Sequence, residues 1–148
     1  MSEPLLKLEN QLCFPLYAAA KEVVARYKPF LDAIGLTYTQ YITMLVLWEH
    51  KTVSAKELGA RLYLDSGTLT PLLKRLEGKG LVLRRRPARD ERLLEVSITA
   101  KGQRLQEKAA QVPLKMQACI SLGHEDTLLL YTLLYKLLHG LEEADCTA

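Results

Sequence analysis

The chain has 148 residues, of which 49% are hydrophobic and 25% are charged, a composition typical of a globular protein with a sizeable core. No apolar run approaches the roughly 18 residues of a membrane span, and no signal peptide is recognisable at the start, where Glu3 and Lys7 interrupt the apolar residues. Three widely spaced cysteines argue against a secreted disulfide framework, so we expect a cytoplasmic protein.

The charge is unevenly distributed along the chain. The formal net charge is +3, but residues 56–92 hold ten Lys/Arg and five Asp/Glu, so this segment carries +5 and the rest of the chain −2. A basic middle between slightly acidic ends indicates a segment that binds a polyanion, carried on a near-neutral scaffold.

The N-terminal part predicts one long helix. Apolar residues recur every three or four positions between Leu5 and Leu31, which suits packing against another helix. Pro15 interrupts this stretch. Because proline lacks a backbone donor, we expect the regular helix to begin near Phe14 and to leave Cys13 at its N-terminal edge.

Two capping boxes predict the next two helices. Thr37 and Gln40 open an apolar and aromatic helix that runs to about residue 50. Ser54 and Glu57 open a short helix that runs to Leu62.

After a brief turn at residues 63 and 64, a further helix is predicted over residues 66–77. Its leucines recur at i, i+3, i+4 and i+7, Asp65 can cap its start, and Gly78 and Gly80 can end it. Its outward face carries hydroxyls and cations and no acid: Ser66, Thr68, Thr70, Lys74 and Arg75. An ordinary surface helix would show the same leucine spacing, but this outward face suits phosphates and base edges in a major groove. The two short helices therefore predict a helix-turn-helix.

A β-hairpin is predicted directly behind this helix, with strands over residues 81–86 and 93–98. A hairpin in this position is a wing. Its arginines are expected to clamp phosphate or to enter the minor groove, with Arg84 and Arg86 at the base and Arg89 and Arg92 at the tip. Asp90 is grouped with these DNA-binding residues because we expect it to orient Arg92 through a charge-assisted hydrogen bond.

The remaining sequence predicts two further helices. Thr99 can cap one that runs towards Ser121 with a bend at Pro113, and the last runs roughly from His124 to Glu143. The last helix carries more leucine than a partly exposed helix of a monomer needs, so it and the N-terminal helix predict a dimer interface. The alternative is a helical bundle within one chain. A dimer would read a pseudo-palindromic DNA site with half-sites about one helical turn apart.

Together these elements predict a mainly α-helical fold with a small β-hairpin wing in a single chain over residues 1–148. Residues 37–98 form the winged helix-turn-helix, and residues 5–31 and 99–146 form the helical part through which the chain dimerises.

The order of elements resembles the MarR family of transcriptional regulators, and Asp90-Glu91-Arg92 matches the wing-tip motif of that family. Within the family, the chain is similar to the organic hydroperoxide sensors called OhrR. The matching pieces are Leu12-Cys13-Phe14, Leu36-Thr37-Tyr38 and the long run from Leu62 to Lys74. They lie within residues 8–100, while the C-terminal third matches in helical pattern.

The resemblance implies a homodimeric repressor that leaves double-stranded operator DNA when an organic hydroperoxide oxidises a cysteine near its N-terminus. By this resemblance Cys13 is the redox-sensing cysteine, Tyr27 and Tyr38 reach its thiolate from the other subunit, and Tyr17 lies nearby. A subset of these sensors forms a disulfide between subunits through a second cysteine, which implies Cys119 as the resolving residue.

The chemistry of the residues agrees with this role. A thiolate, not a thiol, attacks peroxide, so the site must favour the ionised form of Cys13. A helix N-terminus and tyrosine hydroxyl donors both do so, and Tyr17 stands at i+4 from Cys13 on the same helix face. Apolar neighbours on both sides of Cys13 favour organic hydroperoxides over hydrogen peroxide. Pro15 departs from the alanine that the resemblance to OhrR leads us to expect at its position.

Other interpretations stay open at this point. A lone cysteine is often an inert buried residue, and the chain would then be a MarR-type regulator of phenolic ligands. A thiol peroxidase also uses a reactive cysteine, but it has no need of a basic helix and wing, so we expect no enzyme. The cysteines and histidines lack the spacing of a zinc site, so neither metal nor cofactor is expected. The partner of oxidised Cys13 is open between Cys119, Cys146 and a small thiol.

Overall fold

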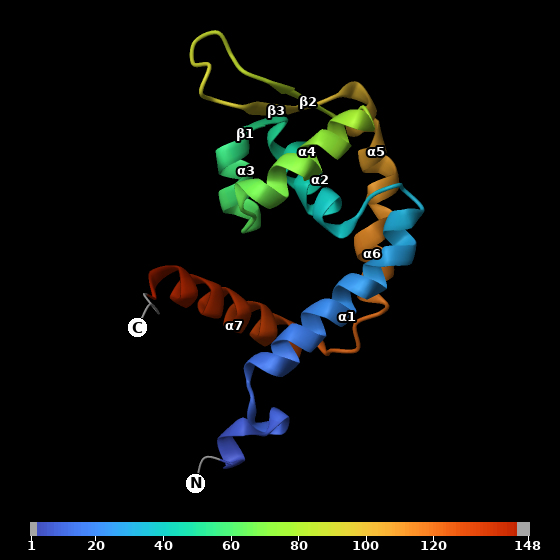
Figure 1. The fold of residues 1–148 in the computed structure, drawn as a ribbon. Helices are drawn as coiled ribbons and strands as arrows, with labels where there is room; N and C mark the ends of the chain where they lie inside the picture. The colour runs from blue at the N-terminus through green and yellow to red at the C-terminus, as the bar shows by residue number, and fades with distance from the viewer. Residues whose placement is uncertain (1–2, 145–148) are drawn as a thin grey trace. The chain divides into compact units, whose positions relative to one another are not determined.

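The computed structural model describes residues 3–144 of the chain, which divides into two compact units, residues 1–116 and residues 117–148 (Figure 1). The first unit contains the helix-turn-helix and the hairpin. The second contains one long helix. None of the helices in the described part is long and apolar enough to cross a membrane.

The first unit begins with two short 3-10 turns and continues as a mixed helical and β region. Its elements in chain order are η1 Glu3–Leu6, η2 Leu8–Asn10, α1 Cys13–Asp32, α2 Tyr38–His50, β1 Thr52–Ser54, α3 Ala55–Leu62, α4 Ser66–Gly78, β2 Val82–Arg85, β3 Glu95–Ile98, α5 Ala100–Ala109 and α6 Gln111–Gln117, which ends at the unit boundary. The second unit carries α7 His124–Glu143. The mainly α-helical fold with a small β wing is as predicted.

Helix α1 begins at Cys13, one residue from the start predicted near Phe14. Pro15 is its third residue, where the missing N–H costs no helical hydrogen bond, because the first-turn donors have no partner within the helix. Leu5, Leu6 and Leu8 lie in the 3-10 turns before Cys13. The apolar spacing before Cys13 therefore does not continue α1, in line with the predicted start near Phe14.

The predicted capping box of α2 is complete, and that of α3 is formed in part. Thr37 and Gln40 form the full capping box of α2: the Gln40 N–H donates to Thr37 Oγ1 (3.3 Å) and the Thr37 N–H donates to Gln40 Oε1 (3.1 Å). At α3 the Glu57 N–H donates to Ser54 Oγ (3.1 Å), but the Glu57 carboxylate accepts from Arg61 (2.8 Å), four residues further along the helix.

The sheet has three strands in the order β1-β3-β2, all antiparallel. Strands β2 and β3 form the predicted hairpin, with Val82 opposite Ile98 and Arg85 opposite Glu95. Strand β1 was not predicted, because three residues are too few to show an alternating pattern. It pairs with β3 and so anchors the hairpin to the segment between α2 and α3.

The core of the first unit joins the helix-turn-helix to the hairpin and α5. Fully buried side chains come from α2, α3, α4, β2 and β3, among them Met44, Leu47, Leu58, Leu73, Leu76, Val82 and Val96. The buried Trp48 indole donates to the Gly102 carbonyl (2.9 Å). A side chain at Gly102 would overlap the Leu81 carbonyl oxygen, so glycine is required where α5 crosses the start of the wing.

The helix after Thr99 departs from the prediction. It ends at Ala109 and a second helix runs from Gln111 to Gln117, so the break comes before Pro113 and not at it, and neither helix reaches Ser121. The reason is steric: a proline ring clashes with the carbonyl four residues earlier, which here belongs to Ala109. Pro113 lies in the first turn of α6, where proline is tolerated.

Helix α7 spans the predicted residues and presents a largely apolar surface. Its exposed large side chains are Leu128, Leu129, Leu130, Tyr131, Leu133, Tyr135, Leu137 and Leu141. So much exposed apolar surface on one helix is typical of an interface. The dimer interface through the terminal helices stays a prediction.

Candidate DNA-binding face and cysteine site

Helix α4 presents the predicted polar face to solvent. Ser66, Thr68, Thr70, Lys74 and Arg75 are all exposed, while Leu69, Leu72, Leu73 and Leu76 are buried on the opposite side. Asp65 caps the helix by accepting the Thr68 N–H at Oδ1 (2.8 Å). The buried leucines therefore fix which face of the helix points outward, and the predicted residues on that face are hydroxyls and cations, with no acidic side chain among them.

The turn between α3 and α4 is tight, as a helix-turn-helix requires. Tyr63 takes a left-handed conformation with φ of 55° and ends α3, and the Leu64 N–H donates to the Gly59 carbonyl (3.0 Å). A Cβ on Gly59 would lie 2.9 Å from the Leu64 carbonyl oxygen. Glycine at position 59 thus lets the turn fold back closely on α3.

At the wing tip, Asp90 holds Arg92 as predicted. Asp90 Oδ1 accepts from the Arg92 backbone N–H (3.0 Å) and from its Nε (3.3 Å). The Arg92 side chain is nonetheless 93% exposed. Its guanidinium therefore projects from the tip in an orientation set by the carboxylate.

The other predicted wing arginines have partners within the chain. Arg89 pairs with Glu95, a carboxylate that is largely buried and also pairs with Arg85 across the hairpin (3.5 Å). Arg86 donates to the Glu91 carbonyl (3.2 Å). The tip is thus tied to the hairpin by its own arginines, and DNA contact by Arg86 and Arg89 stays a prediction.

Of the four predicted wing arginines, Arg84 is held most closely by hydrogen bonds within the chain. Its backbone N–H donates to Glu77 Oε2 (2.9 Å), and its Nη2 and Nε donate to Glu77 Oε1 (3.0 and 3.2 Å). The sequence assigned Arg84 to DNA and did not single out Glu77 or Glu95. The pairing of the two predicted strands could have revealed the role of Glu95, because the hairpin register places Arg85 opposite it.

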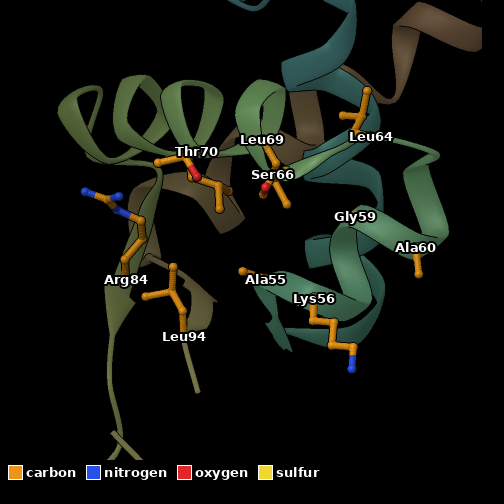
Figure 2. Close-up of a pocket in the computed structure, with 11 residues that line it drawn as sticks. Ala55, Lys56, Gly59, Ala60, Leu64, Ser66, Leu69, Thr70, Arg84 and Leu94 are labelled. Carbon is orange, nitrogen blue, oxygen red and sulfur yellow. The ribbon is translucent and has the colours of Figure 1, made fainter. Parts of the chain in front are cut away.

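A cleft of about 380 Å³ lies between α3, α4 and the wing (Figure 2). Its walls are mostly aliphatic, and the polar groups are Lys56 from α3, Ser66 and Thr70 from α4, and Arg84 from β2. Two residues of the predicted DNA-reading face, Ser66 and Thr70, therefore line this cleft.

Cys13 is the first residue of α1 and is exposed. No side chain caps this end of the helix, so the N–H groups of its first turn point towards the cysteine end with their partial positive charge. Tyr17, one turn along the same face, is 64% exposed. Both groups are therefore accessible to a peroxide or to a second subunit.

Tyr27 and Tyr38 lie together, but far from Cys13 of the same chain. Their ring centroids are 5.0 Å apart, and Tyr41, which the sequence did not single out, packs 5.9 Å from Tyr27. Burial raises the pKa of Tyr27 above its ordinary value, with a smaller contribution from Tyr38, and burial also raises the pKa of Tyr38. Tyr27 is fourteen residues from Cys13 in one helix, which corresponds to about 21 Å along its axis.

A second cleft, of about 280 Å³, lies beside this tyrosine cluster between α1 and the start of α2. Its lining combines aliphatic side chains such as Val24 and Leu36 with the polar and charged residues Lys28, Asp32, Thr37 and Tyr38. A cleft with aliphatic and polar residues in its wall suits a molecule with an apolar body and a polar group.

The remaining cysteines lie in the C-terminal unit. Cys119 is exposed in the turn between α6 and α7, and Cys146 lies outside the described residues. Among the described residues, no group of histidine, cysteine and acidic side chains is arranged to hold a metal ion.

Comparison with known proteins identifies this architecture. A family model described as transcriptional regulator SarA/Rot matches residues 25–109. The organic hydroperoxide resistance transcriptional regulator of Bacillus subtilis (strain 168) is 48% identical over 138 residues, 93% of this chain and 94% of its own length. The chain belongs to the MarR family.

Solved structures place this MarR regulator among DNA-bound winged-helix proteins. AbfR of Staphylococcus epidermidis, solved in reduced form bound to DNA, is 36% identical with a TM-score of 0.78, covering 97% of this chain and 100% of AbfR. NadR, solved with 4-hydroxyphenylacetate, is 30% identical with a TM-score of 0.69, covering 86% of this chain and 92% of NadR. The protein is accordingly a DNA-binding transcriptional regulator.

Proposed function

We propose that this MarR regulator is a repressor that senses organic hydroperoxides through Cys13. The observation that carries the proposal is the placement of Cys13: an exposed thiol at the start of α1, where no side chain caps the helix, in a chain 48% identical to an organic hydroperoxide resistance regulator. The N-terminal partial charge of α1 favours the thiolate, which is the form that attacks peroxide.

The reduced protein binds a pseudo-palindromic operator as a homodimer. The exposed face of α4 enters the major groove, and Arg92 reaches the minor groove or its phosphates from the wing tip. Dimerisation through the apolar surfaces of α1 and α7 supplies the second recognition helix. The DNA-bound structure of AbfR supports this mode of binding.

The tyrosine cluster acts on Cys13 of the partner subunit. An axial separation of about 21 Å rules out contact between Tyr27 and Cys13 along one straight α1, so a hydrogen bond from Tyr27 to the thiolate must come from a second copy. The aliphatic cleft beside Tyr38 suits the organic part of a hydroperoxide. Apolar character here favours organic hydroperoxides over hydrogen peroxide.

Oxidation then proceeds in two steps. The thiolate of Cys13 attacks the outer peroxide oxygen and becomes a sulfenic acid, while the O–O bond breaks and the alkoxide leaves as an alcohol after taking up a proton. The thiol of Cys119 then displaces hydroxide from the sulfenic sulfur, giving a disulfide and water. AbfR has been solved in a disulfide form as well as reduced and overoxidised on DNA, which supports the disulfide as the state that leaves the operator.

No catalytic turnover is part of this function, because each protein molecule consumes one peroxide and stays oxidised until a thiol reduces it. The relatives that match are transcriptional regulators, which supports a sensor over a thiol peroxidase. Steady peroxide consumption with a thiol reductant would instead support the enzyme.

A DNA-shift titration tests the proposal. Reduced protein should shift a duplex that it has selected from a random pool, and cumene hydroperoxide should abolish the shift until a thiol reductant restores it. Cys13→Ser should bind the same duplex and ignore the peroxide. A wild-type shift that persists after peroxide treatment would contradict the sensor function but leave DNA binding intact.

One observation favours a second candidate function. NadR, 30% identical over most of both chains, was solved with 4-hydroxyphenylacetate. The alternative is a regulator that binds a phenolic ligand while Cys13 is inert. Alkylated Cys13 with unchanged DNA binding, together with release of DNA by 4-hydroxyphenylacetate, would support it.

A further inference from the structure

A carboxylate joins the recognition helix to the wing. Glu77, next to the last residue of α4, accepts three hydrogen bonds from Arg84 of β2: the backbone N–H at Oε2 (2.9 Å), and Nη2 and Nε at Oε1 (3.0 and 3.2 Å). Figure 2 shows the Arg84 side chain extending from the wing towards α4. The two side chains are only partly exposed, at 33% for Glu77 and 21% for Arg84.

The position of this pair between α4 and the wing allows it to influence DNA binding. The leucine face of α4 fixes the recognition helix to the core, whereas the wing tip lies beyond the sheet on a loop between residues 86 and 94. The pair ties the final turn of α4 to the strand that leads into that loop. The Arg84 N–H, followed by its guanidinium, lowers the pKa of Glu77, so the carboxylate stays ionised at neutral pH.

We propose that Glu77 is a positioning residue for DNA binding, which holds Arg84 and thereby sets the wing relative to the recognition helix so that both reach the duplex together. The inference rests on the DNA-binding role of the protein and is independent of its redox chemistry. Arg84 is then a structural partner of Glu77 and does not itself bind phosphate.

This role predicts a change opposite in sign to simple electrostatics. A carboxylate near DNA repels phosphate, so its removal should strengthen binding and, if it released Arg84 to a phosphate, steepen the salt dependence. If Glu77 positions the wing, its removal should weaken binding, because the wing arginines no longer meet their phosphates together.

The experiment uses full-length reduced protein and a duplex that the wild-type protein has selected from a random pool. Its affinity is measured over a range of salt concentrations for wild type, Glu77→Gln and a control, Glu57→Gln. Glu57 also pairs with an arginine, Arg61, but within the exposed face of α3 (2.8 Å). Both variants remove one negative charge from the helix-turn-helix region. They differ because only Glu77→Gln alters a contact with the wing.

Glu77→Gln should bind about tenfold more weakly at moderate salt, the effect of removing one charge-assisted hydrogen bond. The slope of log K against log salt should fall in magnitude by about 0.9 for each phosphate that the wing no longer neutralises. A role in stability alone would lower the active fraction and leave this slope unchanged. Glu57→Gln should match wild type or bind slightly more tightly.

Tighter binding or an unchanged salt slope in Glu77→Gln would overturn the inference. If that variant does not fold, Arg84→Gln gives the same readout, and a slope equal to wild type there is equally decisive against it. Where both fold, the double variant should be no weaker than either single one, because the two residues act as a unit. If wild-type protein selects no duplex, the DNA-binding role itself fails.

Discussion

The tyrosine cluster leads to a prediction that depends on the geometry of one helix. Tyr27 stands about 21 Å along α1 from Cys13, and Tyr38 packs against Tyr27 with ring centroids 5.0 Å apart. Neither hydroxyl can donate to Cys13 along one straight α1. If these hydroxyls stabilise the thiolate, they must do so across the dimer, and replacing both with phenylalanine should slow oxidation only of the partner's cysteine.

The size of the effect follows from the hydrogen bond that is removed. A hydrogen bond to a charged group contributes about 1.5–3 kcal/mol, so removing one lowers the thiolate population about tenfold or more. A less stabilised thiolate is also more nucleophilic, with a Brønsted exponent of about 0.4–0.5, so the net rate should fall only about threefold for each hydroxyl removed. Removing both should slow oxidation about tenfold.

Mixed dimers separate action within a subunit from action across the interface. One subunit carries Cys13→Ser with intact tyrosines, and the other carries Tyr27→Phe and Tyr38→Phe with intact Cys13. Stopped-flow oxidation by cumene hydroperoxide should proceed at the wild-type rate in this mixed dimer, but about tenfold more slowly in the dimer whose subunits both lack the hydroxyls. A mixed dimer as slow as the latter would refute the reasoning.

Three further predictions concern the wing, the packing of α5 and the tyrosine pKa values. Arg92→Ala should leave the unfolding free energy within about 0.5 kcal/mol of wild type because its side chain is 93% exposed, yet flatten the salt dependence of operator binding by about one unit per wing; undiminished affinity would remove Arg92 from the DNA interface. Gly102→Ala should cost about 2–4 kcal/mol in urea unfolding, since a Cβ overlaps the Leu81 carbonyl and disturbs the Trp48 hydrogen bond, and a destabilisation below about 0.5 kcal/mol would show that α5 shifts without strain. Burial raises the pKa of Tyr27 and Tyr38 in the folded protein, so their contribution to stability is complete below pH about 10 and is lost as the pH rises further. Urea unfolding between pH 9 and 11 should show this decrease in wild type and a smaller one in Tyr38→Phe, and equal decreases would contradict it.

Local sequence signals predicted most of the fold because the forces behind them are local. The Thr37–Gln40 box, the Asp65 cap and the leucine spacing of α4 each depend on residues within one or two helical turns. The exposed face of α4 and the Asp90–Arg92 contact followed for the same reason. The MarR family, recognised by resemblance, was confirmed by comparison with known proteins.

What the sequence missed depends on contacts between distant or irregular segments. Strand β1 is three residues long and exists only because β3 pairs with it. Glu77 was not expected as the partner of Arg84, because it belongs to another element and only the fold brings the two together, while DNA contact by Arg84 stays untested. The end of α5 at Ala109 could have been predicted from Pro113. In a continuous helix the ring of Pro113 would clash with the Ala109 carbonyl, so the helix must break between them.

The central claim is that oxidation of Cys13 releases DNA. The most direct measurement follows operator binding by fluorescence anisotropy and the oxidation state of Cys13 by mass spectrometry in the same samples, across a titration with cumene hydroperoxide. The fraction of operator released should equal the fraction of Cys13 in a form that dithiothreitol reverses, and both should return to the starting value on reduction. Complete reversible oxidation of Cys13 with the operator still fully bound would contradict the account.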